Sequence, residues 1–101
     1  MNQPAGRREE LGAFLRARRE QVVRSDHGLP PVGRGRTLGL RREEVSYLSG
    51  VSVTWYTWLE QGREIQPSAD ALRRIAKVLQ LDPVESTHLF ALSSRDMPAV
   101  A

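Results

Sequence analysis

Residues 42–62 read REEVSYLSGVSVTWYTWLEQG, and this stretch decides the fold. It begins inside a helix expected over residues 41–49, with Val45 and Leu48 on one side. Gly50 stands just past the expected helix end, where glycine adopts a positive φ at little cost. The first helix therefore ends at a defined point.

A second helix is expected after a turn of about three residues. Ser52 can cap this helix through its hydroxyl, the helix continues to about residue 60, and Gly62 closes it. Two helices of about two turns each, joined by a glycine-containing turn, are typical of a helix-turn-helix, although a generic αα-hairpin shares these features. The small residues Ser46 and Ser49 suit a steep helix crossing.

The remaining sequence predicts three more helices. They are expected over residues 9–24, from Ser68 to about Gln80, and from Asp82 onward, where Asp82, Pro83 and Glu85 resemble a capping box. Their apolar faces comprise Leu11, Phe14, Leu15 and Val22, then Leu72, Ile75, Ala76 and Leu79, then Leu89, Phe90 and Leu92. We therefore expect an all-α domain of five helices over residues 9–93, with flexible segments at 1–8 and 94–101.

A long loop is expected between the first two helices, over residues 25–39. Six glycine or proline residues in this stretch oppose regular structure. Arg34 and Arg36 make the loop basic, and we expect it to be mobile at its tip. On the helix before it, Arg16, Arg18 and Arg19 are expected to be available to solvent or to a partner.

Length and composition fit a single globular domain. The 101 residues are 40% hydrophobic and 27% charged, and they include no cysteine, which excludes a disulfide framework and a thiolate metal site. No apolar run approaches the roughly 20 residues that span a bilayer, and the N-terminal residues lack the apolar core of a signal peptide. We therefore expect a cytoplasmic protein without membrane contact.

The net charge of +3 is unevenly distributed. Residues 1–42 contain ten arginines against four acidic residues, a net of +6, whereas residues 43–101 contain five basic and eight acidic residues, a net of −3. Such a basic half favours a polyanionic partner.

Catalytic and metal-binding chemistry finds little support. His27 and His88 stand apart, without carboxylates at ligand spacing, so no metal or other cofactor is expected. Glu43 and Glu44 are adjacent, and adjacent helical side chains point about 100° apart, so helix-start stabilisation and pairing with arginine are expected of them rather than paired catalysis. We do not expect an enzyme.

Residues 40–68 resemble the helix-turn-helix of Cro/repressor-type (XRE) regulators. The positions that match the family pattern outright are Leu40, Glu43, Glu44, Gly50, Val51, Ser52, Glu60 and Gly62, while Val45, Ser46, Ser49 and Tyr56 occupy its apolar or small positions. With the preceding loop and the phrase YTWLEQGREIQPS, the chain is similar, more narrowly, to the N-terminal domain of MmyB-like bacterial transcription regulators. The resemblance covers about residues 10–93 and implies a five-helix, lambda-repressor-like domain.

The resemblance implies a double-stranded DNA partner and a role for particular residues. The helix over residues 53–60 corresponds to the recognition helix that enters the major groove. Its groove-facing positions are Val53, Thr54, Thr57 and Trp58. The implied phosphate contacts are Arg41, Arg42, Ser52, Arg63 and Gln66. Arg34 and Arg36 have no counterpart in the family pattern.

The sequence departs from the family at two of these positions. Trp58 stands where a polar or basic residue is usual, and Arg41 stands where Thr or Ser usually caps the helix, so Gly39 is the alternative cap. We expect Tyr56 in the core with its hydroxyl reaching a partner, Trp55 at the core edge, and Trp58 on the DNA side.

Two classes of function remain open. One is the DNA-binding domain of a transcription regulator, which in this family is usually followed by a ligand-binding domain that is absent from these 101 residues. The other is a protein-interaction module, such as an antitoxin-like protein that neutralises a partner. A homodimer is plausible, and Leu89, Phe90 and Leu92 of the last helix are its candidate surface.

Overall fold

The computed structural model describes residues 5–93, which form five α-helices and one short 3-10 helix. Along the chain they are α1 (Ala5–Arg19), the 3-10 helix η1 (Arg24–His27), α2 (Arg42–Ser49), α3 (Val53–Glu60), α4 (Ala69–Val78) and α5 (Pro83–Leu92). Within the described residues, strand pairing is limited to two isolated bridges. The expected all-α fold of five helices is confirmed.

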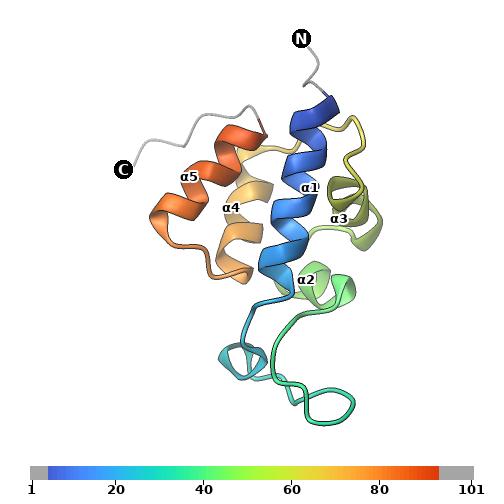
Figure 1. The fold of residues 1–101 in the computed structure, drawn as a ribbon, viewed down its shortest axis with the longest axis vertical. Coiled ribbons are helices and arrows are strands. Elements are labelled where there is room, and N and C mark those ends of the chain that lie inside the picture. Colours follow the sequence, from blue (N-terminus) through green and yellow to red (C-terminus); the bar gives the residue numbers. More distant parts are fainter. Residues whose placement is uncertain (1–4, 94–101) are drawn as a thin grey trace.

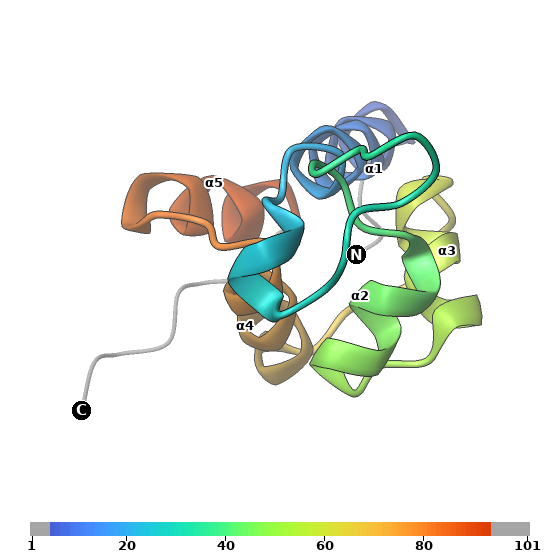
Figure 2. The same ribbon diagram turned by 90° about the horizontal axis from the view of Figure 1, so that it is seen from below.

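In the view of Figure 1, α1 lies in front, with α4 and α5 to its left, α3 to its right and α2 near its lower end. It packs against α3 and α5, while α2 packs against α3 and α4. Seen from below, the helices surround a shared interior (Figure 2). The fully buried side chains there include Leu15, Val45, Tyr56, Leu72, Ile75, Leu89 and Phe90.

A glycine permits the close approach of α1 to α3. A Cβ atom placed on Gly12 would lie 3.0 Å from the carbonyl oxygen of Leu59 and 2.8 Å from the carbonyl carbon of Glu60. Any larger residue in place of Gly12 would therefore push the end of α3 away.

The helix ends carry the caps that the sequence predicts. Gly50 follows α2 with φ 81°, and the hydroxyl of Ser52 accepts a hydrogen bond from the Trp55 amide at 3.0 Å. Ser68 caps α4 in the same way. Asp82 and Glu85 form the reciprocal capping box at the start of α5. These residues mark the end of α2 and the beginnings of α3, α4 and α5.

The first helix and the loop after it differ from expectation. Helix α1 begins at Ala5 and ends at Arg19 instead of spanning residues 9–24, although Val22 beyond its end is still buried. The loop contains η1 and is paired at two bridges, Val23 with Leu38 and Val32 with Arg36. The prediction of an entirely irregular loop was therefore wrong, because positive-φ glycines allow its backbone to pair with itself. The mobile tip stays a prediction. The tail expected to be flexible after residue 93 lies outside the described residues, as do residues 1–4.

The candidate dimer surface on α5 is not available. Leu89, Phe90 and Leu92 are all buried in the core of the single chain, so they cannot form an interface between copies. None of the helices among residues 5–93 has the length and apolar character that a membrane crossing requires.

Candidate nucleic-acid interface

Two serines of α2 form hydrogen bonds to the backbone where this helix meets the turn before α3. The Ser46 hydroxyl donates to the Val51 carbonyl in the turn at 2.5 Å, and the buried Ser49 hydroxyl donates to the Val45 carbonyl at 2.6 Å. The serines at the crossing therefore act through hydrogen bonds to the backbone as well as through their small size.

The outward face of α3 brings the expected base-facing residues together. A shallow cleft of about 250 Å³ is lined by Val53, Thr54, Thr57, Trp58, Gln61 and Arg63. The four expected positions thus share one surface with an arginine at its edge. This surface contains both apolar groups and hydroxyls.

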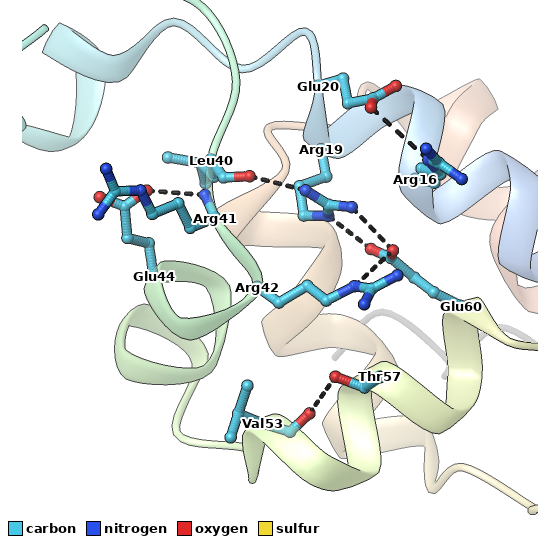
Figure 3. Close-up of polar contacts among 10 residues, drawn as sticks. All are labelled: Arg16, Arg19, Glu20, Leu40, Arg41, Arg42, Glu44, Val53, Thr57 and Glu60. Carbon is cyan, nitrogen blue, oxygen red and sulfur yellow. Dashed lines mark hydrogen bonds and ion pairs between the residues drawn. The ribbon is translucent and has the colours of Figure 1, made fainter. Parts of the chain in front are cut away.

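The two threonines of this face differ in what they can offer. The Thr57 hydroxyl donates its hydrogen to the Val53 carbonyl at 2.7 Å (Figure 3). Because a hydroxyl has one hydrogen and two lone pairs, Thr57 is left as an acceptor toward any ligand. Thr54 is exposed, and its hydroxyl has no hydrogen bond within residues 5–93.

Trp58 lies at the edge of the α3 face, with 36% of its surface exposed. The guanidinium of Arg63 lies over its ring, 5.6 Å from the ring centroid, and Arg63 Nε donates to Gln61 Oε1 at 3.1 Å. The cation is thereby held beside the indole, and its terminal nitrogens make no hydrogen bond within residues 5–93.

The other two aromatic residues of α3 turn inward. Tyr56 is fully buried and Trp55 packs at the edge of the core, as expected. Burial raises the pKa of the Tyr56 hydroxyl. The nearby Glu60 carboxylate also raises this pKa. The hydroxyl was expected to reach a partner, but it forms no hydrogen bond within the described part of the chain.

Three helices meet at the carboxylate of Glu60, whose side chain is only 1% exposed. Arg19 of α1 donates to both of its oxygens, at 2.6 and 2.9 Å, and Arg42 of α2 donates to one of them at 3.1 Å (Figure 3). Arg19 also donates to the Leu40 carbonyl at 2.9 Å, so it is not the solvent-facing arginine that the sequence suggested.

The cluster carries two positive charges and one negative charge. Burial of Glu60 is the largest single effect and opposes its ionisation, but the neighbouring hydrogen-bond donors and the charge of Arg19 together outweigh it, so the pKa of the carboxyl is lowered. One positive charge remains in excess at neutral pH, and Arg42 is the more exposed of its two arginines.

Arg41 occupies the N-cap position of α2, which corrects the expectation that Gly39 caps this helix. Its side chain accepts no hydrogen bond; instead the Glu44 carboxylate accepts one from the Arg41 amide at 2.7 Å. The Arg41 side chain itself is exposed. Glu44 is held on its other side by Arg24, and this arginine lowers the pKa of the Glu44 carboxyl to about 2.

The two remaining phosphate candidates differ in their surroundings. Ser52 is exposed, and its oxygen is used as a cap acceptor while its hydroxyl hydrogen has no partner among residues 5–93. Gln66 is also exposed, but its amide nitrogen donates to the Ser93 carbonyl at the end of α5, at 3.4 Å. Of the five candidates, only Gln66 is directed toward α5.

Sequence reasoning missed the residues that position this surface. Gly12, Arg19 and Arg24 lie far from the helix-turn-helix in sequence, yet they fix α3 and the start of α2. The sequence did contain a signal for Glu60, the partner of Arg19, because it is the only charged residue on a helix that is otherwise apolar or neutral.

Comparison with known proteins supports the motif that the geometry shows. Searches of curated proteins and of solved structures found no significant match. The model of a family described as a helix-turn-helix domain matches residues 10–89, which include α2, the turn and α3. The chain belongs to this family of helix-turn-helix domains.

Proposed function

We propose that the chain binds double-stranded DNA sequence-specifically, as the DNA-binding domain of a bacterial transcription regulator of the XRE, MmyB-like type. Helix α3 enters the major groove, whose width of roughly 12 Å admits an α-helix. The observation that carries this proposal is the outward face of α3, where four residues and Arg63 line one cleft, while Arg41 is exposed at the N-cap of the preceding helix α2.

The basic residues around this face suit the phosphate backbone. Arg63 keeps its terminal nitrogens available beside Trp58, Arg41 is exposed at the start of α2, and Arg42 belongs to a cluster with one excess positive charge. The unused hydrogen of the Ser52 hydroxyl can be donated to a phosphate oxygen. These contacts orient the domain and make affinity depend on salt, without reading sequence.

The α3 face supplies the base contacts in this proposal. Val53 and the Thr54 methyl can pack on thymine C5-methyl groups, and Trp58 adds apolar surface. Thr57, limited to accepting, selects a base that presents an amino group in the major groove, which means cytosine or adenine. Because none of the four base-facing residues is Arg, Asn or Gln, sequence is read mostly through single hydrogen bonds and apolar contacts.

Selection from a pool of random duplex DNA, followed by sequencing, tests this function. We expect an enriched sequence whose affinity falls as salt increases. Trp58→Ala should alter the enriched sequence, whereas Arg41→Gln should weaken binding to all sequences and make the salt dependence shallower by about one counterion. The paired change Arg73→Gln with Lys77→Gln removes two exposed charges from α4 and serves as the control.

Failure to enrich any sequence, with only loose binding that moderate salt abolishes, would contradict the proposal. In that case the surface around Trp58 would fit a protein partner better, as in an antitoxin-like module.

A further inference from the structure

We propose that the loop between α1 and α2 carries a second DNA contact, made by Arg34 and Arg36 on the phosphate backbone beyond the start of α2. We call residues 32–36 the arginine arm. This inference rests on the proposed DNA binding, and it assigns a partner to a segment that the helix-turn-helix does not need. Three features of the arm support it: its anchored base, its backbone pairing and its two arginines.

The base of the loop is anchored by a buried arginine. Arg24 is 2% exposed, and its guanidinium donates to the Pro30 and Gly39 carbonyls at 2.7 and 3.0 Å. The same guanidinium holds both Glu44 oxygens at 2.7 Å. Since Glu44 lies in the first turn of α2, the loop is tied to the helix start beside which Arg41 is exposed.

Backbone pairing closes the loop above this anchor. The Arg24 amide donates to the Thr37 carbonyl at 2.9 Å, and the Gly39 amide donates to the Val22 carbonyl at 2.8 Å. The two sides of the loop therefore run together from the helical body toward the arm. In Figure 1 the loop projects from the end of the body where α2 lies.

The arm itself is a turn that is closed by backbone hydrogen bonds between its two ends. Val32 and Arg36 exchange both backbone hydrogen bonds, each 2.9 Å long. Between them Gly33 and Gly35 adopt positive φ values of 57° and 84°, which places Arg34 at the tip. No neighbouring atom lies within 4 Å of a Cβ added at either glycine, so the backbone is open on both sides of Arg34.

The arginines of the arm have no internal task. Their guanidinium groups form no ion pair or hydrogen bond within the part of the chain that the structure describes. No acidic residue occurs between Asp26 and Glu43, so nothing nearby in sequence neutralises them. By contrast Arg19, Arg24 and Arg42 each pair with a glutamate.

The arm adjoins the phosphate-contacting edge of the proposed interface. Arg36 and Arg41 line one cleft of about 450 Å³, together with Leu38, Leu40 and the acidic Glu20. The Glu20 carboxylate is already paired with Arg16, at 3.6 Å. A duplex whose backbone meets Arg41 therefore continues past Arg36. Two unpaired guanidinium groups on a projecting, anchored turn match a line of phosphates, because each can donate paired hydrogen bonds to phosphate oxygens.

Duplex length separates this contact from the recognition of the site. The probe is the sequence enriched by the full 101-residue chain, made once with about one helical turn of flanking DNA on each side and once trimmed to the site. We expect Arg34→Gln with Arg36→Gln to weaken binding to the long duplex and to lower its salt slope by about 2, one per phosphate contact. On the trimmed duplex the variant and the parent should bind equally.

The matched control again removes two exposed charges from α4, by Arg73→Gln with Lys77→Gln, and should leave the difference between long and trimmed duplexes unchanged. Equal binding of the parent and the Arg34/Arg36 variant to the long duplex would overturn the inference while leaving the proposed function intact. If the parent enriches no sequence, both fail together. A defect that vanishes when the flanks are changed from A·T to G·C would also overturn it, because backbone contacts carry no sequence information.

Discussion

Arg19 in the last turn of α1 and Glu60 in the last turn of α3 form a bidentate ion pair between the two helices, with N–O distances of 2.6 and 2.9 Å. Arg42, at the start of α2, shares the same carboxylate. The helix proposed to read DNA and the helix start proposed to contact phosphate are thus fixed to one another through a single buried side chain. The orientation of α3 is therefore set by an electrostatic contact as well as by apolar packing.

Replacing Glu60 with glutamine should destabilise the domain strongly. The change removes the negative charge and leaves Arg19 and Arg42 beside each other without their counterion, and breaking a buried pair costs about 3 kcal/mol. Chemical denaturation that compares the free energy of unfolding of Glu60→Gln with that of the parent measures this.

Glu64 supplies the comparison, since its carboxylate is exposed in the loop after α3. Glu64→Gln should change the unfolding free energy by less than about 0.5 kcal/mol. Equal effects of the two substitutions would mean that the Arg19–Glu60 pair does not stabilise the fold.

Stability should decrease in acid through Glu44. The pKa of its carboxyl is lowered from 4.5 to about 2, first by the hydrogen bonds from Arg24. A carboxyl with a lowered folded-state pKa contributes stability that is full above the unfolded-state pKa. This contribution is then lost as the pH falls from about 4.5 toward 2. Unfolding free energies measured between about pH 6 and pH 2, the range in which carboxyls titrate, should fall less steeply for Glu44→Gln than for the parent.

Asp70 provides the reference for this acid dependence, because its pairs with Arg73 and Arg74 are exposed and salt-screened. Asp70→Asn should reproduce the parent's slope. A slope for Glu44→Gln that equals the parent's would show that the Arg24–Glu44 pair is not the source of the acid sensitivity.

Two glycines of α1 should respond to alanine in opposite directions. Gly6→Ala should stabilise the domain by up to about 1 kcal/mol, because alanine favours helix and a Cβ there meets no atom within 4 Å. Gly12→Ala should destabilise it despite the same helical preference, since its Cβ would press on the backbone at the end of α3. Thermal unfolding of both variants tests this pair, and a stabilised Gly12→Ala would mean that α1 and α3 can separate at no cost.

Much of the fold follows from local signals in the sequence. Ser52, Ser68 and Asp82 are cap residues with definite hydrogen-bonding roles, and Gly50 requires a positive φ, so these helix ends could be placed correctly. The end of α1 could not be, because Val22 keeps the apolar period of the helix after the backbone has left it. Its burial depends on the tertiary fold and is invisible to periodicity.

The supports of the site were harder to foresee than its surface. The family resemblance could identify Thr57 and Trp58 as groove-facing positions, because they stand at a fixed spacing from the turn. It could not reveal that Arg24 is buried or that Arg19 pairs with Glu60, which lies 41 residues further along the chain. Arginine in a basic segment reads as a solvent-facing charge unless its acidic partner, brought close only by folding, is known.

The internal hydrogen bond of Thr57 limits which bases it can select. Its hydroxyl hydrogen is donated to the Val53 carbonyl, so only lone pairs face a ligand. Thr57→Val keeps the shape of the side chain and removes the acceptor. In the selection experiment, the preference for cytosine or adenine at one position should weaken by roughly 1 kcal/mol, the net value of one hydrogen bond, with the other positions unchanged.

Thr87 of α5 makes the same bond, from its hydroxyl to the Pro83 carbonyl at 2.9 Å, on a helix away from the proposed interface. Thr87→Val therefore reproduces the local change in the helix without touching DNA, and should leave every base preference intact. If Thr57→Val alters the preferences no more than Thr87→Val does, α3 does not present Thr57 to a base. If Thr57→Val instead weakens a preference for guanine or thymine, the parent hydroxyl must donate to a base acceptor, which requires it to rotate on binding and give up its bond to Val53.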